Sequence, residues 1–465
     1  MDALVLWHPM RAFAYLFVLG LTACSVGKPY ERPQIATPVQ WRADTGSVVE
    51  TWPSADWWRG FGSPQLDELM ATARKANDDI SAAVARVIQA DAQVRIAGAP
   101  LLPSIGATGD ASRQHQQLTS GGTRTFSQFG AQLNASYELD FWGKNRAAHA
   151  AAQAVATATR YDQATIELTV MASVATTYFQ ILALRERVDV AQNNLAAAQK
   201  ILDGLKLEQS TGTITALDVA QQDTTVATLS AAIPPLQQQL QQSLNALAIL
   251  VGQAPENLDV TTGALTDLSQ PKVAPGIPSE LLNRRPDVAE AEAQLVAANA
   301  SITAARAALF PSIDLTAAGG YVSTALSTLL NPVNQVFSLT AGLSQPIFAG
   351  GALRGQLAYS KGRYAELLSD YHKAVISAFG NVEDQLTALQ QTGDQQQRQQ
   401  DAVAKARRAY QLAQSQLHAG TVNILVVLNT EGALFAAEDA LVQARFFHLQ
   451  ALVGLFNALG GGWKS

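Results

Sequence analysis

The chain lacks most of the features that mark enzymes and disulfide-stabilised domains. A single cysteine stands among 465 residues, so no internal disulfide can form. The six histidines show no pair at metal-binding spacing. A Gly-x-x-x-x-Gly-Lys phosphate loop and a Gly-x-Ser-x-Gly nucleophile elbow are both missing. The sequence therefore predicts no metal, no cofactor, no catalytic residue and no enzyme activity.

Aromatic residues, positive charge and long apolar runs are also scarce. Only 7% of the residues are aromatic, and the formal net charge of −6 argues against nucleic acid as a partner. Beyond residue 24 no run of about 18 apolar residues occurs, so we expect no membrane-spanning helix. Without one, a chain can cross a membrane only as closed β-strands.

The N-terminal segment resembles a bacterial secretion signal. An apolar stretch at residues 12–21 is too short to span a bilayer and leads into Leu21-Thr22-Ala23-Cys24. We predict a lipoprotein-type signal peptide at residues 1–23. Cleavage then leaves Cys24 as an N-palmitoyl and S-diacylglycerol cysteine, which anchors the chain in lipid. Ser25 in place of Asp fits sorting to the outer membrane, and a buried free cysteine is the alternative interpretation.

One sequence pattern occurs twice, at a constant offset of 208 positions (311 − 103 = 208). The matched pairs are Pro103 with Pro311, Gly143 with Gly351, Gly212-Thr213 with Gly420-Thr421, Leu217 with Leu425, and Gly252 with Gly460. Duplicated units of this size usually build a pseudo-symmetric wall or channel and not a catalytic cleft. After the signal peptide we predict an N-terminal lipid-anchored segment at 24–76, repeats at 77–252 and 285–460 joined by a linker at 253–284, and a tail at 461–465.

Each repeat contains two segments with the alternation of an amphipathic strand. Residues 131–141 and 337–347 alternate apolar with polar side chains, and companion strands begin near Ser104 and Ile313. Four strands of about ten residues can cross a bilayer at a tilt but cannot close a barrel, which starts at about eight strands. The barrel would have to be shared between chains. The alternative is a soluble sandwich of the four strands.

Very long helices follow the second strand of each repeat. Residues 147–209 and 354–419 each predict roughly 60 residues of helix, about 90 Å at 1.5 Å per residue. A shorter helix at residues 79–99 precedes the first strand pair. Glycines at the two Gly-Thr pairs predict the turns that close the long helices, and return helices follow. Pro234-Pro235 predicts an interruption of the first return helix. The fold class is an internally duplicated α+β membrane protein.

These residues also carry a resemblance to a known family. The chain resembles the TolC-like outer-membrane factors, in the acylated branch that serves resistance-nodulation-division efflux systems (NodT-type outer-membrane efflux lipoproteins). The stretches that carry it are Ser25-Val26-Gly27 through Arg32-Pro33, Trp57-Trp58-Arg59-Gly60-Phe61, Leu282-Asn283-Arg284-Arg285-Pro286-Asp287-Val288, Leu309-Phe310-Pro311-Ser312-Ile313, Ser344-Gln345-Pro346-Ile347-Phe348 followed by Gly350-Gly351, and Asn457-Ala458-Leu459-Gly460-Gly461-Gly462-Trp463. They extend over essentially the whole chain after Cys24.

The resemblance implies an assembly and partners. It implies a homotrimer in which each chain gives four strands to a twelve-stranded β-barrel in the cell outer membrane, continuous with an α-helical barrel in the periplasm. Such a trimer is a passive efflux duct for drugs or other small toxic compounds, and it belongs to the machinery of antibiotic resistance. Its partners are a periplasmic adaptor (membrane fusion) protein and an inner-membrane efflux pump.

The resemblance also suggests site residues. The tip residues Gly212, Thr213, Gly420 and Thr421 match the region that meets the adaptor. Acidic residues often form a constriction just beyond the tips in this family, and Asp218 and Asn429 are the corresponding candidates for a gate. The second repeat has Val426 where the first has Asp218, which departs from the pattern. Asp218 as a simple helix-start acid, favoured by the helix dipole, is the alternative.

Two other functions fit a similar architecture. The duct could serve protein export in a type I secretion system, but the lipobox and the Leu-Gly-Gly-Gly-Trp ending favour drug efflux. A non-conducting envelope lipoprotein would need no lipid-facing strands, and the alternation at residues 131–141 and 337–347 argues against it.

Overall fold

The computed structural model describes residues 26–42, 52–117, 121–260, 263–273 and 275–463. The chain divides into two compact units, each assembled from segments of both repeats. The first unit comprises residues 1–34, 86–160 and 290–372, and the second comprises residues 35–85, 161–289 and 373–465. The long helices therefore contribute one part to each unit.

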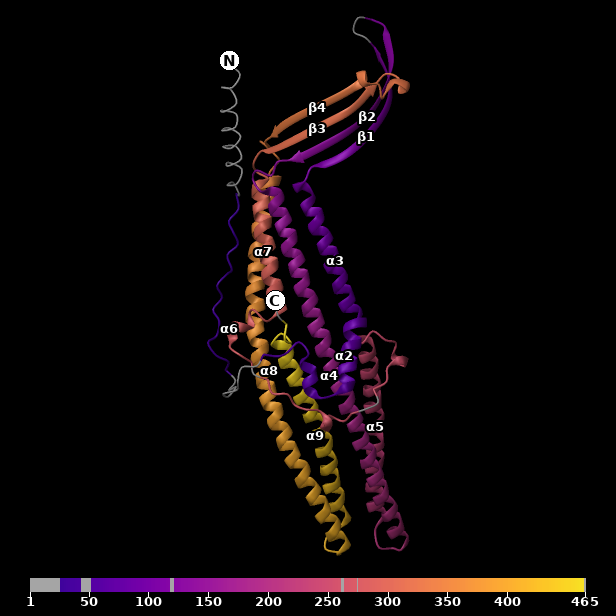
Figure 1. Cartoon of the computed structure of the whole chain (residues 1–465). Helices are drawn as coiled ribbons and strands as arrows, with labels where there is room; N and C mark the ends of the chain where they lie inside the picture. The colour runs from indigo at the N-terminus through magenta and orange to yellow at the C-terminus, as the bar shows by residue number, and fades with distance from the viewer. Residues whose placement is uncertain (1–25, 43–51, 118–120, 261–262, 274, 464–465) are drawn as a thin grey trace. The chain divides into compact units, whose positions relative to one another are not determined.

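The first unit contains a four-stranded antiparallel sheet in the order β1-β2-β3-β4 (Figure 1). Its strands are β1 (Ser104–Gln117), β2 (Thr123–Glu138), β3 (Ser312–Ser323) and β4 (Gln335–Ser344). All four predicted strands are confirmed, although β2 and β4 each end three residues before the predicted segments do, at Glu138 and Ser344. The Asp140 carboxylate accepts hydrogen bonds from the backbone N–H groups of Asn145 and Arg146, at 2.9 and 2.8 Å. Asp140, near the end of the predicted strand, therefore caps the start of the helix that begins at Lys144.

One face of this sheet is apolar and exposed. Ala107 lies opposite Leu133, and Ala317 lies between Ala135 and Leu339, so these side chains share one face across all four strands. Leu133 is 62% exposed and Leu339 is 80% exposed. Within the described chain β1 and β4 each pair on one side only, which leaves two open edges.

The helices repeat with the offset found in the sequence. Helices α4 (Lys144–Ser210) and α8 (Ala352–His418) have 67 residues each, and they begin 208 positions apart (352 − 144). Helices α5 (Ala216–Leu250) and α9 (Ile424–Ala458) have 35 residues each. Helices α3 (Asp78–Gly98) and α7 (Pro286–Ala307) precede the two strand pairs. The predicted α+β fold with internal duplication is confirmed.

The second unit contains a large core around the first tryptophan-rich segment. It includes α2 (Pro64–Ala76) and the short α6 (Pro278–Leu281), together with parts of the long helices. Trp57 stacks on Phe456 of α9 with ring centroids 4.9 Å apart, and Phe61 contacts Phe179 of α4 at the same distance. Aromatic pairs of this kind add about 0.5–1.5 kcal/mol each beyond the burial of their area.

The predicted interruption at Pro234-Pro235 is wrong. Helix α5 continues through both prolines to Leu250. Both rings lie on an exposed part of the helix, where water can hydrogen-bond the carbonyl groups that lose their N–H partners. The return helices of the two repeats are therefore equal in length.

Among the described residues, one helix is apolar enough over 18 residues to cross a membrane by length and composition, and this helix is α4. More than half of that window, 56%, is buried in the protein. Such burial is typical of a core helix, so the window gives only weak support for a membrane span.

Candidate functional site: the two helical tips

The first tip joins α4 to α5 by a glycine turn. Gly212 has φ of 79°, a left-handed conformation that glycine adopts without steric cost. The carbonyl of Glu208 accepts hydrogen bonds from the backbone N–H and the Oγ1 hydroxyl of Thr213, at 3.1 and 2.7 Å. The threonine thus satisfies a carbonyl that the end of the helix leaves without an intrahelical partner.

The second tip joins α8 to α9 with the same geometry. Gly420 has φ of 68°. Thr421 donates from its backbone N–H and from Oγ1 to the carbonyl of Gln416, both at 3.0 Å. The four residues that the sequence assigned to the tips therefore form two equivalent, exposed turns.

The starts of the return helices differ between the tips. Thr215 and Asp218 form a capping box, in which the Asp218 carboxylate accepts from the Thr215 backbone at 2.9 Å and from its hydroxyl at 2.7 Å. These hydrogen bonds hold the pKa of Asp218 below its usual value. Asn423, the equivalent of Thr215, makes no side-chain cap hydrogen bond. This geometry gives Asp218 a structural role at the helix start.

The two gate candidates lie on different helices. Asp218 is in the first turn of α5, whereas Asn429 is an exposed residue in the second turn of α9. Within the described part of the chain no hydrogen bond joins them. The structure of one chain thus does not bring them together, and their assignment as a gate stays a prediction.

Two apolar clusters connect the four helices just behind the tips. The tip cluster consists of Leu205, Ala413, Ile424 and Val427, with Ile214 and Val219 packed against it. The second cluster lies further from the tips and consists of Val403, Leu434, Phe435 and Leu441, with Leu229 packed against it. Because both clusters draw residues from both repeats, the two hairpins form one packed bundle.

Ion pairs tie α9 to its neighbours in the same unit. Arg187 of α4 binds Asp439 at 2.6 Å, and Arg407 of α8 binds Glu438 at 2.7 Å. Arg445 binds one carboxylate oxygen of Glu186 at 2.9 Å. Burial raises the pKa of Glu186, and Arg445 opposes that rise. Glu438 and Asp439, the adjacent acidic residues of α9, therefore have a structural role in ion pairs with α8 and α4.

The predicted lipidation residue Cys24 lies outside the described residues. The described chain after it, residues 26–42, has no regular secondary structure, and side chains of the second repeat hold it. Arg306 donates to the carbonyl of Val26 at 2.7 Å, and Arg32 forms an ion pair with Glu292 at 2.9 Å. The Arg32 Nε also donates to the Tyr371 hydroxyl at 3.3 Å. The chain downstream of the expected anchor is thus fixed to helices α7 and α8.

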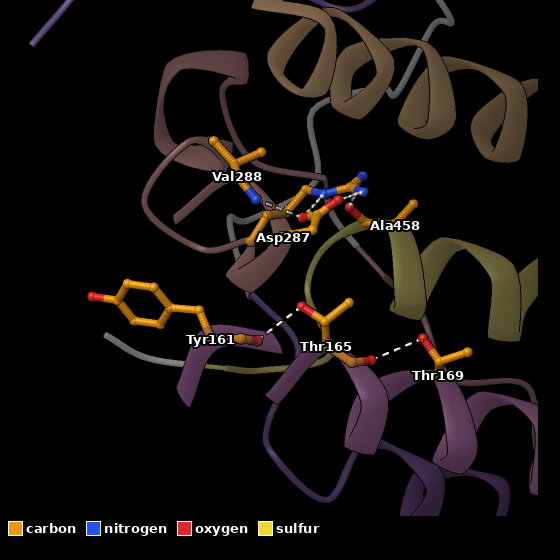
Figure 2. Close-up of polar contacts among 7 residues, drawn as sticks. Tyr161, Thr165, Thr169, Asp287, Val288 and Ala458 are labelled. Carbon is orange, nitrogen blue, oxygen red and sulfur yellow. Dashed lines mark hydrogen bonds and ion pairs between the residues drawn. The ribbon is translucent and has the colours of Figure 1, made fainter. Parts of the chain in front are cut away.

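A groove that the sequence did not predict lies between α4, α8 and α9. Two adjoining cavities of about 660 and 270 Å³ share Thr169, Gln385, Gly454 and Asn457. Figure 2 shows the hydroxyls beside the smaller cavity, where Thr165 donates to the Tyr161 carbonyl at 3.0 Å and Thr169 donates to the Thr165 carbonyl at 2.8 Å. In the sequence, the four-residue spacing of Thr165 and Thr169 is the feature that could have indicated this groove, because it places both hydroxyls on one face of a helix.

Three residues of the predicted family motif, Arg285, Pro286 and Asp287, line part of the smaller cavity. The buried Arg285 guanidinium donates to both Asp287 oxygens, at 2.9 and 2.6 Å, and to the carbonyl of Ala458 at 3.2 Å (Figure 2). Its charge is therefore already neutralised. Within the described ranges no three His, Cys, Asp or Glu side chains gather closely enough to hold a metal ion.

Comparison with known proteins gives the family. The sequence pattern of one protein family, described as outer membrane efflux protein, matches the chain twice, over residues 69–253 and 277–461. The chain belongs to this family. It is 43% identical over 440 residues to the pyoverdine export outer membrane protein OpmQ of Pseudomonas aeruginosa, covering 93% of this chain and 92% of the relative. It is 30% identical to the cation efflux system protein CusC of Escherichia coli, covering 98% and 99%.

Solved structures agree with this assignment. The outer-membrane channel OprN superposes with a TM-score of 0.89 at 26% identity, covering 95% of this chain and all of that one. A CusC structure gives a TM-score of 0.85 at 30% identity, covering 94% and 100%. The outer membrane efflux proteins are channel proteins, and the chain is an outer-membrane efflux channel, as the sequence predicted.

Proposed function

We propose that this chain is the lipid-anchored subunit of a homotrimeric duct that passively conducts small molecules out of the cell. The four-stranded sheet with two open edges is the observation that carries the proposal. Open edges in lipid leave backbone groups without hydrogen bonds, at several kcal/mol each. Three copies pair these edges and give twelve strands with the apolar faces of the sheets toward lipid.

The tips are the proposed docking surface for a periplasmic adaptor, which links the duct to an inner-membrane pump. The tips carry exposed leucines beside their glycine turns. Leu207 and Leu217 flank the first tip at 69% and 65% exposure, and Leu425 follows the second at 38%. Exposed apolar groups gathered at the end of a helical bundle favour contact with another protein.

The anchor proposal rests on Cys24 and the segment after it. Acylation of Cys24 buries many methylene groups, at about 0.8 kcal/mol each. The ion pair between Arg32 and Glu292 then fixes the segment that follows the anchor to the helices. Together they would hold the mature N-terminus at the membrane.

Accumulation of a fluorescent efflux substrate tests the proposed function. Cells that lack the protein should accumulate the substrate, and wild-type protein should restore export. Cys24→Ala should restore export less well if the anchor matters for assembly. Unchanged accumulation after deletion would contradict export of small molecules and would favour another cargo, such as protein.

Pyoverdine is the specific cargo that the comparisons favour. Two pyoverdine export proteins, from P. aeruginosa and P. putida, are 43% and 41% identical to this chain, whereas the toluene efflux protein TtgF is 33% identical. We infer that this chain can replace OpmQ. In a P. aeruginosa strain lacking OpmQ, its expression should restore pyoverdine in the medium, and failure despite correct localisation would contradict the inference.

A further inference from the structure

A polar pair is buried between the two apolar clusters behind the tips. Glu431 of α9 and Gln222 of α5 are both 0% exposed. Glu431 is four residues beyond Val427 of the tip cluster and three residues before Leu434 of the second cluster, so it faces the same interior. Tyr410 of α8 packs against both clusters.

The pair has more acceptors than donors. The Gln222 Nε2 group donates to the carbonyl of Ala198 on α4, at 2.8 Å. Its Oε1 atom and both carboxylate oxygens of Glu431 are buried without a hydrogen-bond partner. Three buried acceptor oxygens on two neighbouring side chains are costly when no donor meets them.

The surroundings of Glu431 offer no compensating charge. Helix α5 presents the neutral Gln222 amide, α8 presents the Tyr410 phenol, and α4 presents the Ala198 carbonyl behind Gln222. Glu431 forms no ion pair with any described residue. Burial raises the pKa of Glu431 to about 7, and a polar contact with the Gln222 side chain, too long or too bent to be a hydrogen bond, opposes that rise. Burial and the nearby Glu431 in turn raise the pKa of Tyr410.

We propose that Glu431 is a proton-binding site that latches α5 to α9 behind the tips. The bound proton supplies the missing donor, because the carboxylic O–H of Glu431 can donate to Gln222 Oε1. Release of the proton to water leaves a buried carboxylate without a counter-charge. The two helices then separate until water reaches it. The inference concerns the packing of α5 against α9, so its test does not depend on the proposed cargo or partners.

The sign of the pH dependence follows from the two states. Glu431 titrates near 7 in the packed state and near its ordinary value of 4.5 once water reaches it. Raising the pH from the lower value through the higher one therefore favours the separated state. Between about pH 5.5 and pH 8 the opening equilibrium should rise on the order of tenfold.

The internal repeat supplies a matched control. Asp223 of α5 is the equivalent of Glu431 (431 − 223 = 208), and it is exposed. Asp223→Asn removes an acid from the same repeat position without touching the buried pair. Glu431→Gln keeps the shape of the side chain and supplies a permanent N–H donor.

Hydrogen exchange of the full-length wild-type protein and these two variants tests the proposal. For peptides covering residues 216–232 and 424–440, the ratio of the wild-type rate to the Glu431→Gln rate is taken at each pH. This ratio should rise on the order of tenfold between about pH 5.5 and about pH 8. Asp223→Asn should behave as wild type. A ratio that does not change with pH would overturn the proposal.

Infrared titration of the wild-type protein gives a second readout that does not depend on exchange. Subtracting the Glu431→Gln spectrum should leave one protonated carboxylic C=O band at about pH 5.5, which disappears with a midpoint near 7. Absence of that band at the lower pH would show that Glu431 is already ionised, and it would also overturn the latch.

Discussion

Equivalent positions of the two repeats carry different side chains near the tips. Thr215 caps α5 through its hydroxyl, whereas the equivalent Asn423 makes no cap hydrogen bond to α9. Asp223 is exposed, whereas the equivalent Glu431 is buried. The duplication thus preserves the backbone of the tips, while the side chains of each repeat have separate roles.

The unequal caps give a prediction at the residue scale. Thr215→Ala should destabilise the start of α5 by about 1 kcal/mol, because it removes an N-cap hydrogen bond. Hydrogen exchange of the first-turn amides of α5 should accelerate about fivefold. Asn423→Ala is the matched control and should change exchange in α9 much less. Equal effects at both positions would contradict the assigned capping roles.

At the scale of elements, the sequence predicted most of the backbone. Alternation located the four strands, and the glycine-threonine pairs located both tips, because these signals are local. The course of α5 through Pro234-Pro235 was not predictable, since the exposure of that face depends on which helices pack against it. The Glu431–Gln222 pair joins two repeats, and the apolar periodicity of one helix does not identify its partners.

The glycine turns give a prediction at the element scale. Gly212→Ala should destabilise the first tip by about 1 kcal/mol, because φ there is 79°. Amide exchange around the turn should accelerate, and adaptor binding should weaken. Gly204→Ala is the control, because Gly204 lies within α4 with nothing within 4 Å of an added Cβ. That change should slightly stabilise the helix, and an unchanged tip in Gly212→Ala would contradict the turn assignment.

The exposed face of the sheet gives a second element-scale prediction. Leu339→Arg places a charge on the proposed lipid-facing side and should cost about 2–4 kcal/mol near the middle of the membrane. The amount of protein in the outer-membrane fraction should fall. Thr340→Arg, the neighbour on the opposite face of β4, should insert almost normally. Normal insertion of Leu339→Arg would argue for a scaffold lipoprotein without lipid-facing strands.

At the scale of the whole molecule, one chain is incomplete as a membrane channel. Its sheet has two open edges and an exposed apolar face, and its tips carry exposed leucines. Both features are costly for an isolated chain. The proposed trimer accounts for the open sheet edges and the proposed adaptor accounts for the tips.

The mass of the purified, full-length protein in detergent tests this account most directly. The account predicts a complex of three chains, each about 49.3 kDa before removal of the signal peptide. Leu339→Arg protein extracted in the same detergent should give little of this species. A wild-type protein that is monomeric or dimeric under conditions that preserve its fold would contradict the shared barrel and the duct built on it.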